Sequence, residues 1–166
     1  RPKGICGSGM IDCLAEFQEA GVVSQNGKFN GELSALTPRM RQGENGWEYV
    51  LCWKDETQLE DDICVTEPDI DNLIRTKASI YAACSVLLKS VGLQFTDVQK
   101  IIIAGGFGQY IDVEKAMTIG LLPEANPEIV SYGGNTSLTG CKIAALNREK
   151  IEEAETVATM ITNIEL

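Results

Sequence analysis

The sequence predicts an α/β domain in which a mixed sheet is flanked by helices. A continuous apolar run over residues 98–104 is typical of a strand that is buried on both faces of a parallel sheet. This run is followed by a helical pattern, a further strand and a further helix, and such crossovers connect parallel strands. Upstream, two short segments rich in β-prone residues indicate antiparallel pairing. Both kinds of strand pairing are therefore expected.

The size and the charge limit the classes of function. The 166 residues are 44% hydrophobic and 23% charged, which predicts one domain over 1–166 that is long enough to bury a core. Lys and Arg number 14 against 24 Asp and Glu, so the net charge of −10 repels nucleic acid and anionic membranes. No apolar run resembles a membrane span or a signal core, so neither membrane insertion nor export is expected. The net charge does not exclude a local pocket that binds a phosphate group.

The sequence has no histidine, which excludes histidine-based catalytic triads and facial-triad iron sites within this chain. Its six cysteines are scattered without a Cys-x-x-Cys pair, a pattern that favours reduced, buried thiols in a cytoplasmic protein. Spacing alone leaves open a metal cluster at Cys6, Cys13, Cys52 and Cys64, but buried thiols are the simpler interpretation. No metal site is predicted.

The N-terminal third combines a short helix with a long surface segment. A helical period predicts a helix over 9–20, with Gly21 after its last turn as a C-cap. Residues 24–46 are rich in Asn, Gly, Gln and Ser, so they are expected to form a surface excursion. One short strand is expected inside it, near 27–33.

Two strands are predicted next, over 47–53 and 63–66, as antiparallel neighbours. The acidic stretch 55–62 between them is expected to be a solvated loop. Three large aromatic residues alternate along the first strand and are expected to fill one side of the sheet, although a face that binds a partner stays open: Trp47, Tyr49 and Trp53.

The strongest helix pattern begins near Thr66 or Asp69 as a cap and ends at Gly92. Its apolar residues follow the three-and-four spacing of one buried face: Ile70, Leu73, Ile74, Ile80, Tyr81, Cys84, Leu87, Leu88 and Val91. Lys77 is the only charge on that face. A cation in this position must extend to solvent, pair with a neighbour or meet a ligand anion.

The C-terminal half alternates strands and helices. After the strand over 98–104, the pattern predicts a short helix over 110–120, a strand over 128–132, a helix of small residues over 136–146 and a charged helix over 147–161.

The strand over 98–104 ends at Gly105-Gly106-Phe107-Gly108. Open α/β sheets bind ligands at the carboxyl edge of their strands, and paired glycines let a ligand lie against bare backbone. The spacing matches neither the dinucleotide fingerprint nor a P-loop. Nucleotide binding and a plain tight turn both stay open for this element.

Two more glycine-rich elements precede helices. Residues 133–140 repeat the pattern at the next strand end, where Asn135, Thr136 or Ser137 can cap a helix or contact a ligand. At the start of the chain, residues 4–9 place Ser8 and Gly9 before a helix that contains Asp12. Their amides could face an anion, or Ser8 could simply cap the helix.

Taken together in this order, these elements resemble the reductive activators of corrinoid proteins. The segments that carry the resemblance are Gly4-Ile5-Cys6-Gly7-Ser8-Gly9-Met10-Ile11-Asp12, Asp69-Ile70 with Lys77 and Ala78, Ile103-Ala104-Gly105-Gly106-Phe107-Gly108, Ile119-Gly120-Leu121-Leu122-Pro123 and Gly134-Asn135-Thr136-Ser137-Leu138. Members of that family are iron-sulfur ATPases with the acetate/sugar kinase, heat-shock chaperone and actin fold (ASKHA). They reduce a cobalt(II) corrinoid to cobalt(I) and so restore methyl transfer.

The resemblance implies a ribonuclease H-like, actin-like ATPase lobe with an adenosine motif at Gly105, Gly106, Phe107 and Gly108. Lys77 matches a lysine on the helix that lies across the nucleotide cleft, which implies a nucleotide-facing role. Asn135 lies in a segment that matches the second connecting helix, where the two lobes meet. One departure is Ile74, where the family often has Gln, so polar contacts from that turn are in doubt.

The same resemblance implies what other parts of the parent protein must supply. The Asp-x-Gly turns that hold Mg²⁺ and the phosphates of ATP or ADP are not recognisable here, and the cysteine pattern of a plant-type [2Fe-2S] ferredoxin is absent. The chain is therefore expected to be the C-terminal lobe of the ATPase domain, without the upstream lobe and the iron-sulfur domain. Alone it should not turn over ATP. The implied partner is a corrinoid protein, and the oligomeric state, including a homodimer, is left open.

Two other functions stay open at this point. A small-molecule kinase of the same fold would share the nucleotide lobe, and an iron-sulfur domain in the parent would decide against it. A non-catalytic interaction module would use the glycines only as turns and would bind no adenine nucleotide.

Overall fold

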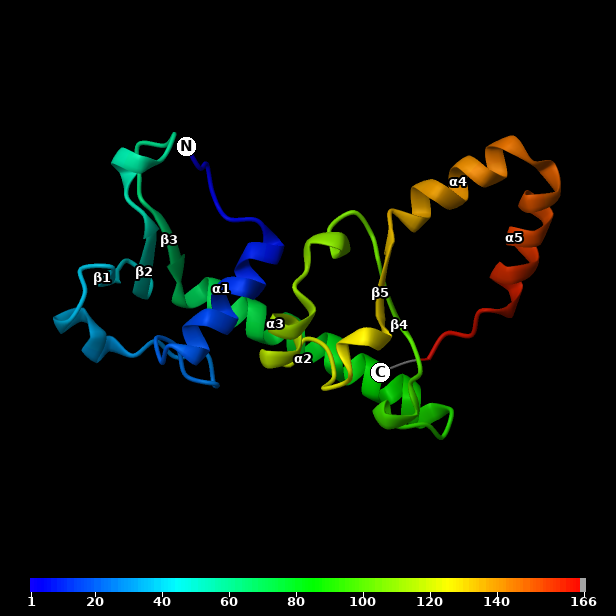
Figure 1. The fold of residues 1–166 in the computed structure, drawn as a ribbon, viewed down its shortest axis with the longest axis horizontal. Helices are drawn as coiled ribbons and strands as arrows, with labels where there is room; N and C mark the ends of the chain where they lie inside the picture. Colours follow the sequence, from blue (N-terminus) through cyan, green and yellow to red (C-terminus); the bar gives the residue numbers. More distant parts are fainter. Residues whose placement is uncertain (165–166) are drawn as a thin grey trace. The chain divides into compact units, whose positions relative to one another are not determined.

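The computed structural model describes residues 1–164 and divides the chain into two compact units. Unit 1 comprises residues 1–82 and 111–124, and unit 2 comprises residues 83–110 and 125–166, of which 165 and 166 lie outside the described residues. Figure 1 labels the elements of both units. The chain passes from one unit to the other inside a long helix, after Tyr110 and after Glu124.

Unit 1 contains a three-stranded antiparallel sheet in the order β1-β2-β3. Its strands are β1 (Met40–Gly43), β2 (Gly46–Cys52) and β3 (Ile63–Thr66), and the second and third confirm the predicted antiparallel neighbours. The sequence prediction missed β1. It pairs Gly43 with Gly46 across a two-residue turn, and Gly46 has a φ of +108°, a conformation that favours glycine.

The predicted strand near 27–33 is wrong. The structure shows only an isolated bridge between Val23 and Phe29, followed by a short 3-10 helix over Gly31–Ala35. The side chain of Asn30 caps that helix by accepting a hydrogen bond from the backbone N–H of Glu32 at 3.3 Å. Asn side chains compete with strand pairing through such local bonds, which explains why the strand does not form.

Three helices complete unit 1: α1 (Gly7–Glu19), the first part of α2 (Glu67–Ser90) and α3 (Val113–Thr118). Of the two predicted caps of α2, the structure favours Thr66, because the helix begins at Glu67 and the backbone N–H of Asp69 donates to the Thr66 hydroxyl at 3.4 Å, while the backbone N–H of Thr66 donates back to the Asp69 carboxylate at 3.0 Å. All the buried hydrophobic residues of the described chain lie in this unit: Ile11, Leu14, Ala15, Phe17, Val23, Phe29, Met40, Val50, Ile63, Val65, Ile70, Ala116 and Ile119.

The aromatic residues of β2, together with Trp53 directly after the strand, serve the structure of unit 1. The ring of Tyr49 packs on the buried ring of Phe17, with centroids 4.8 Å apart, and Trp47 lies against Gly31. Trp53 has the guanidinium groups of Arg39 and Arg41 over its ring, at 5.7 and 6.0 Å. These contacts support the prediction that the three aromatic residues pack within unit 1, and not the alternative that they form an exposed face for a binding partner.

The acidic stretch 55–62 is not wholly a solvated loop, which corrects the prediction. Asp62 forms an ion pair of 2.7 Å with Arg41, which also pairs with Glu48 at 2.7 Å. The Asp62 carboxylate further accepts a hydrogen bond from the backbone N–H of Lys54. These bonds lower the pKa of Asp62. The hydroxyl of Thr57 is tied to backbone carbonyls, so the loop folds on itself.

Unit 2 is built on a parallel pair of strands, β4 (Ile101–Ala104) and β5 (Val130–Gly134), as the sequence predicted. Two helices follow, α4 (Thr136–Leu146) and α5 (Arg148–Met160), shown in orange and red in Figure 1. Parallel and antiparallel pairing therefore both occur, in separate sheets of the described chain.

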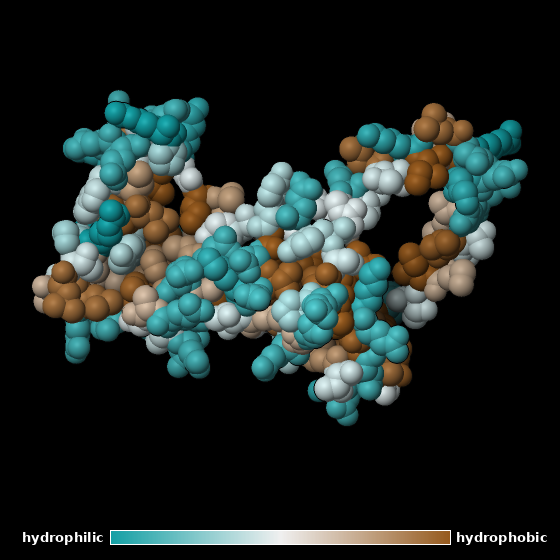
Figure 2. Space-filling model, in the orientation of Figure 1, coloured by the Kyte–Doolittle hydropathy of each residue, from teal (hydrophilic) through white to brown (hydrophobic). Residues whose placement is uncertain are grey.

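Much of the apolar surface of unit 2 is open, which corrects two predictions. The strand β4 is not buried on both faces, because Ile102 is 60% exposed. The second half of α2 does not form a buried face, since Leu87 and, directly after the helix, Val91 are exposed in unit 2, and Ile80 and Tyr81 are exposed at the end of unit 1. Figure 2 shows apolar atoms on the surface over α4 and α5. The described part of unit 2 has too few elements to cover both faces of its sheet and its helices.

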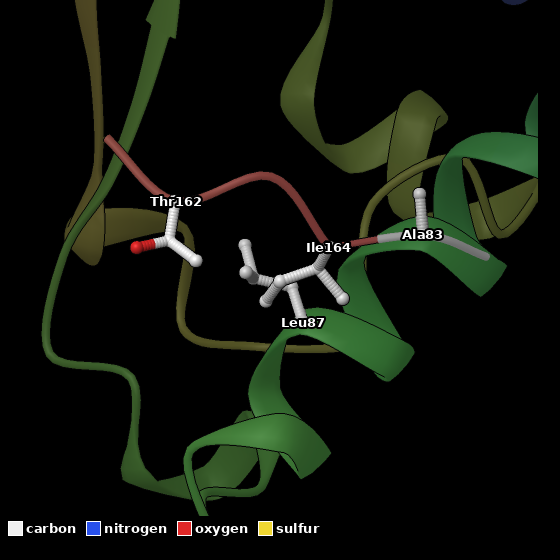
Figure 3. A pocket seen from close by; sticks show the side chains of 4 residues that line it. All are labelled: Ala83, Leu87, Thr162 and Ile164. Atoms are coloured by element: carbon white, nitrogen blue, oxygen red, sulfur yellow. The ribbon is translucent and has the colours of Figure 1, made fainter. Parts of the chain in front are cut away.

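Two apolar hollows lie within unit 2. Small residues of α4 and apolar residues of α5 line a groove of about 490 Å³. A smaller pocket lies between α2 and the C-terminal segment, where Figure 3 shows the side chains of Leu87 and Ile164 beside one another. Within residues 1–164, no helix is both long enough and apolar enough to cross a membrane.

The six cysteines are free thiols, and none of them is fully buried. Cys6, Cys84 and Cys141 are exposed, which corrects the prediction of buried thiols. Cys84 lies on the part of α2 that belongs to unit 2. Because few elements of unit 2 pack against this part of the helix, the Cys84 side chain is exposed.

Candidate functional site

The first glycine turn begins where β4 ends. Gly105 has a φ of +109°, which only glycine adopts readily, and its N–H donates a 2.7 Å hydrogen bond to the carbonyl of Gly134. A Cβ atom added at Gly105 or Gly106 would meet no other atom within 4 Å. The backbone of this turn therefore borders open space in the described chain, and a flat ligand can approach it closely.

The other two residues of this turn differ in their roles. Phe107 is 49% exposed beside the open backbone, so its ring is available for contact with a base. Gly108 is buried and begins a short 3-10 helix over Gly108–Tyr110. A Cβ atom at Gly108 would lie 2.5 Å from the side chain of Ile103, so this glycine serves packing.

Asn135 follows the second glycine turn and confirms the capping prediction. Its side-chain oxygen accepts a 3.0 Å hydrogen bond from the backbone N–H of Leu138 and so caps α4. The preceding Gly134 has a φ of +64°. Because β4 and β5 are parallel neighbours, both glycine turns lie at the same carboxyl edge of the sheet.

The third glycine element leads into α1 in unit 1. Its N-cap is Cys6 and not Ser8, which corrects the alternative that Ser8 caps the helix. The hydroxyl of Ser8 is buried and lies 3.3 Å from the sulfur of Cys6, so its side chain is not presented to solvent. Gly9 lies in the first turn, where a Cβ atom would be 3.0 Å from Ile5. The bond from Ser8 lowers the pKa of the Cys6 thiol.

Asp12 of α1 has one carboxylate oxygen without a hydrogen-bond partner among the described residues. This atom, Oδ1, is buried. A buried carboxylate oxygen without a partner is costly.

Lys77 of α2 is engaged within unit 1. Its ammonium group donates a hydrogen bond to the backbone carbonyl of Ile119, at the C-terminal end of α3. The side chain is partly buried, and this burial lowers the pKa of Lys77. Of the three roles that the sequence left open for this cation, pairing with a neighbour is the one that the structure shows. The residue before it on the same face, Ile74, lies against Gly27 and packs on the core.

The structure brings only some of the predicted site residues together. Gly105, Gly106, Phe107 and Gly108 lie beside Asn135 in unit 2, whereas Ser8, Gly9 and Lys77 belong to unit 1. Sequence reasoning missed the carbonyl of Ile119, because no side-chain pattern marks a backbone acceptor. It also gave Gly134 no separate role, although a glycine at a strand end before a capping Asn is a signal for a turn with positive φ.

The described residues do not fit a metal site. Nowhere in residues 1–164 do three or more His, Cys, Asp or Glu side chains lie close enough together to hold a metal ion. Cys13 in particular is a poor ligand, because burial and the neighbouring carboxylates of Asp12 and Glu16 raise the pKa of its thiol to about 11.

Comparisons with known proteins agree with one another. Residues 1–166 match the family described as the C-terminal domain of RACo, the ASKHA domain. The chain is 34% identical over 170 residues to the corrinoid activation enzyme RamQ of Eubacterium limosum, covering 99% of this chain and 29% of that protein. It is 26% identical over 160 residues to the [Co(II) methylated amine-specific corrinoid protein] reductase of Methanosarcina barkeri, covering 96% of this chain and 25% of that protein.

A solved structure of a reductive activator for corrinoid, iron-sulfur protein superimposes with a TM-score of 0.90 at 43% identity, covering 97% of this chain and 25% of that chain. The chain thus spans between a quarter and a third of the length of these relatives. The likeness supports the predicted mixed α/β fold with helices flanking its sheets. By its match over all 166 residues, the chain belongs to the family of the C-terminal ASKHA domain of RACo.

Proposed function

We propose that this chain is the adenosine-side lobe of the ATPase domain in a protein that reductively activates corrinoid proteins. The single observation that carries the nucleotide site is the open backbone at Gly105 and Gly106, at the carboxyl edge of the parallel strands. Family membership and the activities named for the relatives support the reaction. They favour it over a small-molecule kinase and over a non-catalytic interaction module.

The residues present fit an adenosine group but not the whole of ATP. Glycines without side chains over open space accept the base and ribose, and the exposed Phe107 ring offers a stacking surface. We propose that the upstream lobe of the parent protein completes the site with Mg²⁺ and the phosphate contacts. When bound, ATP supplies the free energy of phosphoryl transfer.

The contribution of this lobe is to bind and orient. Residues 1–166, comprising both units, are proposed to form one lobe that closes with its upstream counterpart on the nucleotide. Ligand binding shifts the lobes only by the difference in its affinity for the open and closed forms. The glycine turn therefore needs to contact the nucleotide more tightly in the closed form.

Reduction of cobalt(II) to cobalt(I) adds one electron. We propose that the electron comes from a [2Fe-2S] cluster in another part of the parent protein, because the described residues do not fit a metal site. The corrinoid protein is the proposed partner of the parent. We also propose a cytoplasmic location, in keeping with six free thiols.

Gly106→Ala tests this function. The added methyl group meets no neighbour and Gly106 has no positive φ, so the variant should unfold at the same temperature as the wild type. The methyl would instead occupy the space of the adenosine, and we expect ADP affinity to fall by about tenfold or more. Calorimetric titration of the full-length protein measures this change.

The matched control is Gly140→Ala in the interior of α4. It adds the same methyl group, again with no atom within 4 Å, so ADP affinity should stay within about twofold while the helix is stabilised by about 1 kcal/mol. ATP-dependent formation of cobalt(I), followed by its absorbance, should fall with Gly106→Ala and not with the control. Unchanged ADP affinity in Gly106→Ala would contradict the proposed site.

A further inference from the structure

Three Asn-Gly pairs lie in unit 1, at residues 26–27, 30–31 and 45–46. In such a pair, the backbone nitrogen of the glycine can attack the side-chain amide of the Asn, because glycine has no Cβ atom to hinder the approach. The attack requires an unbonded Asn side chain and a backbone that can move. Because the three pairs share the same local sequence, the fold decides which of them reacts first.

The pair at 26–27 is held by the core of unit 1. Gly27 is buried, and its N–H donates a 2.9 Å hydrogen bond to the carbonyl of Ser24. A Cβ atom added at Gly27 would lie 3.3 Å from Ile70, whose side chain is fully buried. The nitrogen of Gly27 can therefore attack only after this part of unit 1 opens.

The pair at 30–31 is held by its own side chain. The side-chain oxygen of Asn30 accepts a 3.3 Å hydrogen bond from the backbone N–H of Glu32, and Gly31 lies against the ring of Trp47. Attack on the Asn30 amide must first break this hydrogen bond, which slows the reaction by about fivefold.

The pair at 45–46 is the least restrained of the three. Asn45 is exposed, and its side chain forms no hydrogen bond within residues 1–164. It lies in the two-residue turn between β1 and β2, where Gly46 and Gly43 form the last pair of the ladder. Because β1 has four residues and lies at the edge of its sheet, opening of this last pair is enough to release the nitrogen of Gly46.

We propose that Asn45 is a site of spontaneous deamidation. The nitrogen of Gly46 loses its proton to solvent and attacks the side-chain carbonyl carbon of Asn45. A five-membered imide closes, and the side-chain nitrogen takes up a proton and leaves as ammonia. Water then opens the imide at either carbonyl, which leaves an aspartate or an isoaspartate at position 45. One water is consumed and one ammonia is released, with no oxidation or reduction. The reaction is independent of the proposed nucleotide site.

Either product is expected to loosen the hairpin of β1 and β2. The carboxylate of Glu67 lies against Gly46, and that of Glu48 lies against Gly43, so that a Cβ atom at either glycine would collide with it. A new carboxylate at position 45 is repelled by both. An isoaspartate also lengthens the main chain by one carbon, which shifts Gly46 from its φ of +108° and from its pairing with Gly43.

The first experiment follows all three pairs in one sample of the full-length protein. Folded protein and protein unfolded in urea are incubated at pH 8, and peptide mass spectrometry measures the conversion of each Asn over time. In the folded protein, Asn45 should react about fivefold or more faster than Asn26 or Asn30, whereas the three rates should converge in urea. Asn45→Gln is the matched control, because its ring closure would need a less favourable six-membered imide. It should abolish the fast reaction and leave the other two rates unchanged.

The second measurement tests the effect on the hairpin. Modified protein is separated from unmodified protein by anion exchange, and amide hydrogen exchange is compared between the two. Exchange should be faster in β1 of the modified protein and the same in α5. Equal rates at the three Asn residues of the folded protein, or a faster reaction at Asn26 or Asn30, would overturn the proposed site. Unchanged exchange in β1 after modification would overturn the proposed effect on the hairpin.

Discussion

Unit 1 and unit 2 use similar elements but differ in how they bury them. In unit 1, the sheet and three helices enclose a common core around Leu14, Val65 and Ile70. In the described part of unit 2, the sheet has two strands and no hydrophobic side chain is fully buried. A two-stranded parallel pair with open faces buries little apolar surface, so the described part of unit 2 is expected to be less stable than unit 1. The candidate nucleotide turn lies in this less buried unit.

The largest expected effect contrasts a core residue of unit 1 with an exposed apolar residue of unit 2. Ile70→Ala removes a side chain that is 0% exposed and should lower the free energy of unfolding by about 2–5 kcal/mol. Ile143→Ala in α4, where the side chain is 49% exposed, should cost about 1 kcal/mol or less in this chain. Urea unfolding of both variants measures the difference. Equal losses would contradict the contrast between the units.

Asn135→Ala should have a smaller effect that is confined to unit 2. Loss of the N-cap of α4 should cost about 1 kcal/mol and should speed amide exchange in the first turn of α4. Asn135→Asp keeps the acceptor and is the matched control. Faster exchange in α1 as well would show that the units do not respond separately.

The acid stability of unit 1 should depend on Asp62. Its pKa is lowered in the folded state by the N–H of Lys54 and by Arg41, so its stabilising contribution is present above the ordinary pKa of an Asp, near 4, and is lost as the pH falls below that value. Asp62→Asn should lower stability at pH 7 and should flatten the loss of stability between about pH 5 and pH 2. The same acid profile in both proteins would contradict this role.

The smallest effect concerns two thiols at the start of unit 1. Cys6 is exposed with a lowered pKa, whereas the pKa of Cys13 is raised to about 11. At pH 8, a thiol reagent should therefore modify Cys6 well before Cys13. Mass spectrometry of the early products measures the order, with Cys6→Ser as the control. Modification of Cys13 first would rule out the assigned environments.

Local signals in the sequence predicted most elements. The three-and-four spacing and the Thr66 and Asp69 caps located α2, and the apolar run before Gly105 located β4. The polar sequence of β1 hid that strand, although Asn45-Gly46 is a strong signal for a tight hairpin turn. Sequence patterns show which residues are apolar but not which of them pack against another element. For this reason the sequence predicted that Ile102 is buried, whereas its side chain is exposed.

The candidate site was predicted in part. A strand that ends in paired glycines placed the turn correctly at the sheet edge, because that signal is local. The contact of Lys77 with Ile119 and that of Arg41 with Asp62 depend on tertiary folding and join residues far apart in sequence. No periodicity reports such pairs.

The most direct test of the nucleotide site is an isotope-resolved titration of the full-length protein with ADP, adenosine and GTP, following the backbone amides of Gly105, Gly106 and Gly108. We predict saturable shifts of Gly105 and Gly106 with ADP and adenosine and much weaker shifts with GTP. Tight ADP binding that leaves these amides unchanged would contradict the assignment of the adenosine site to this turn.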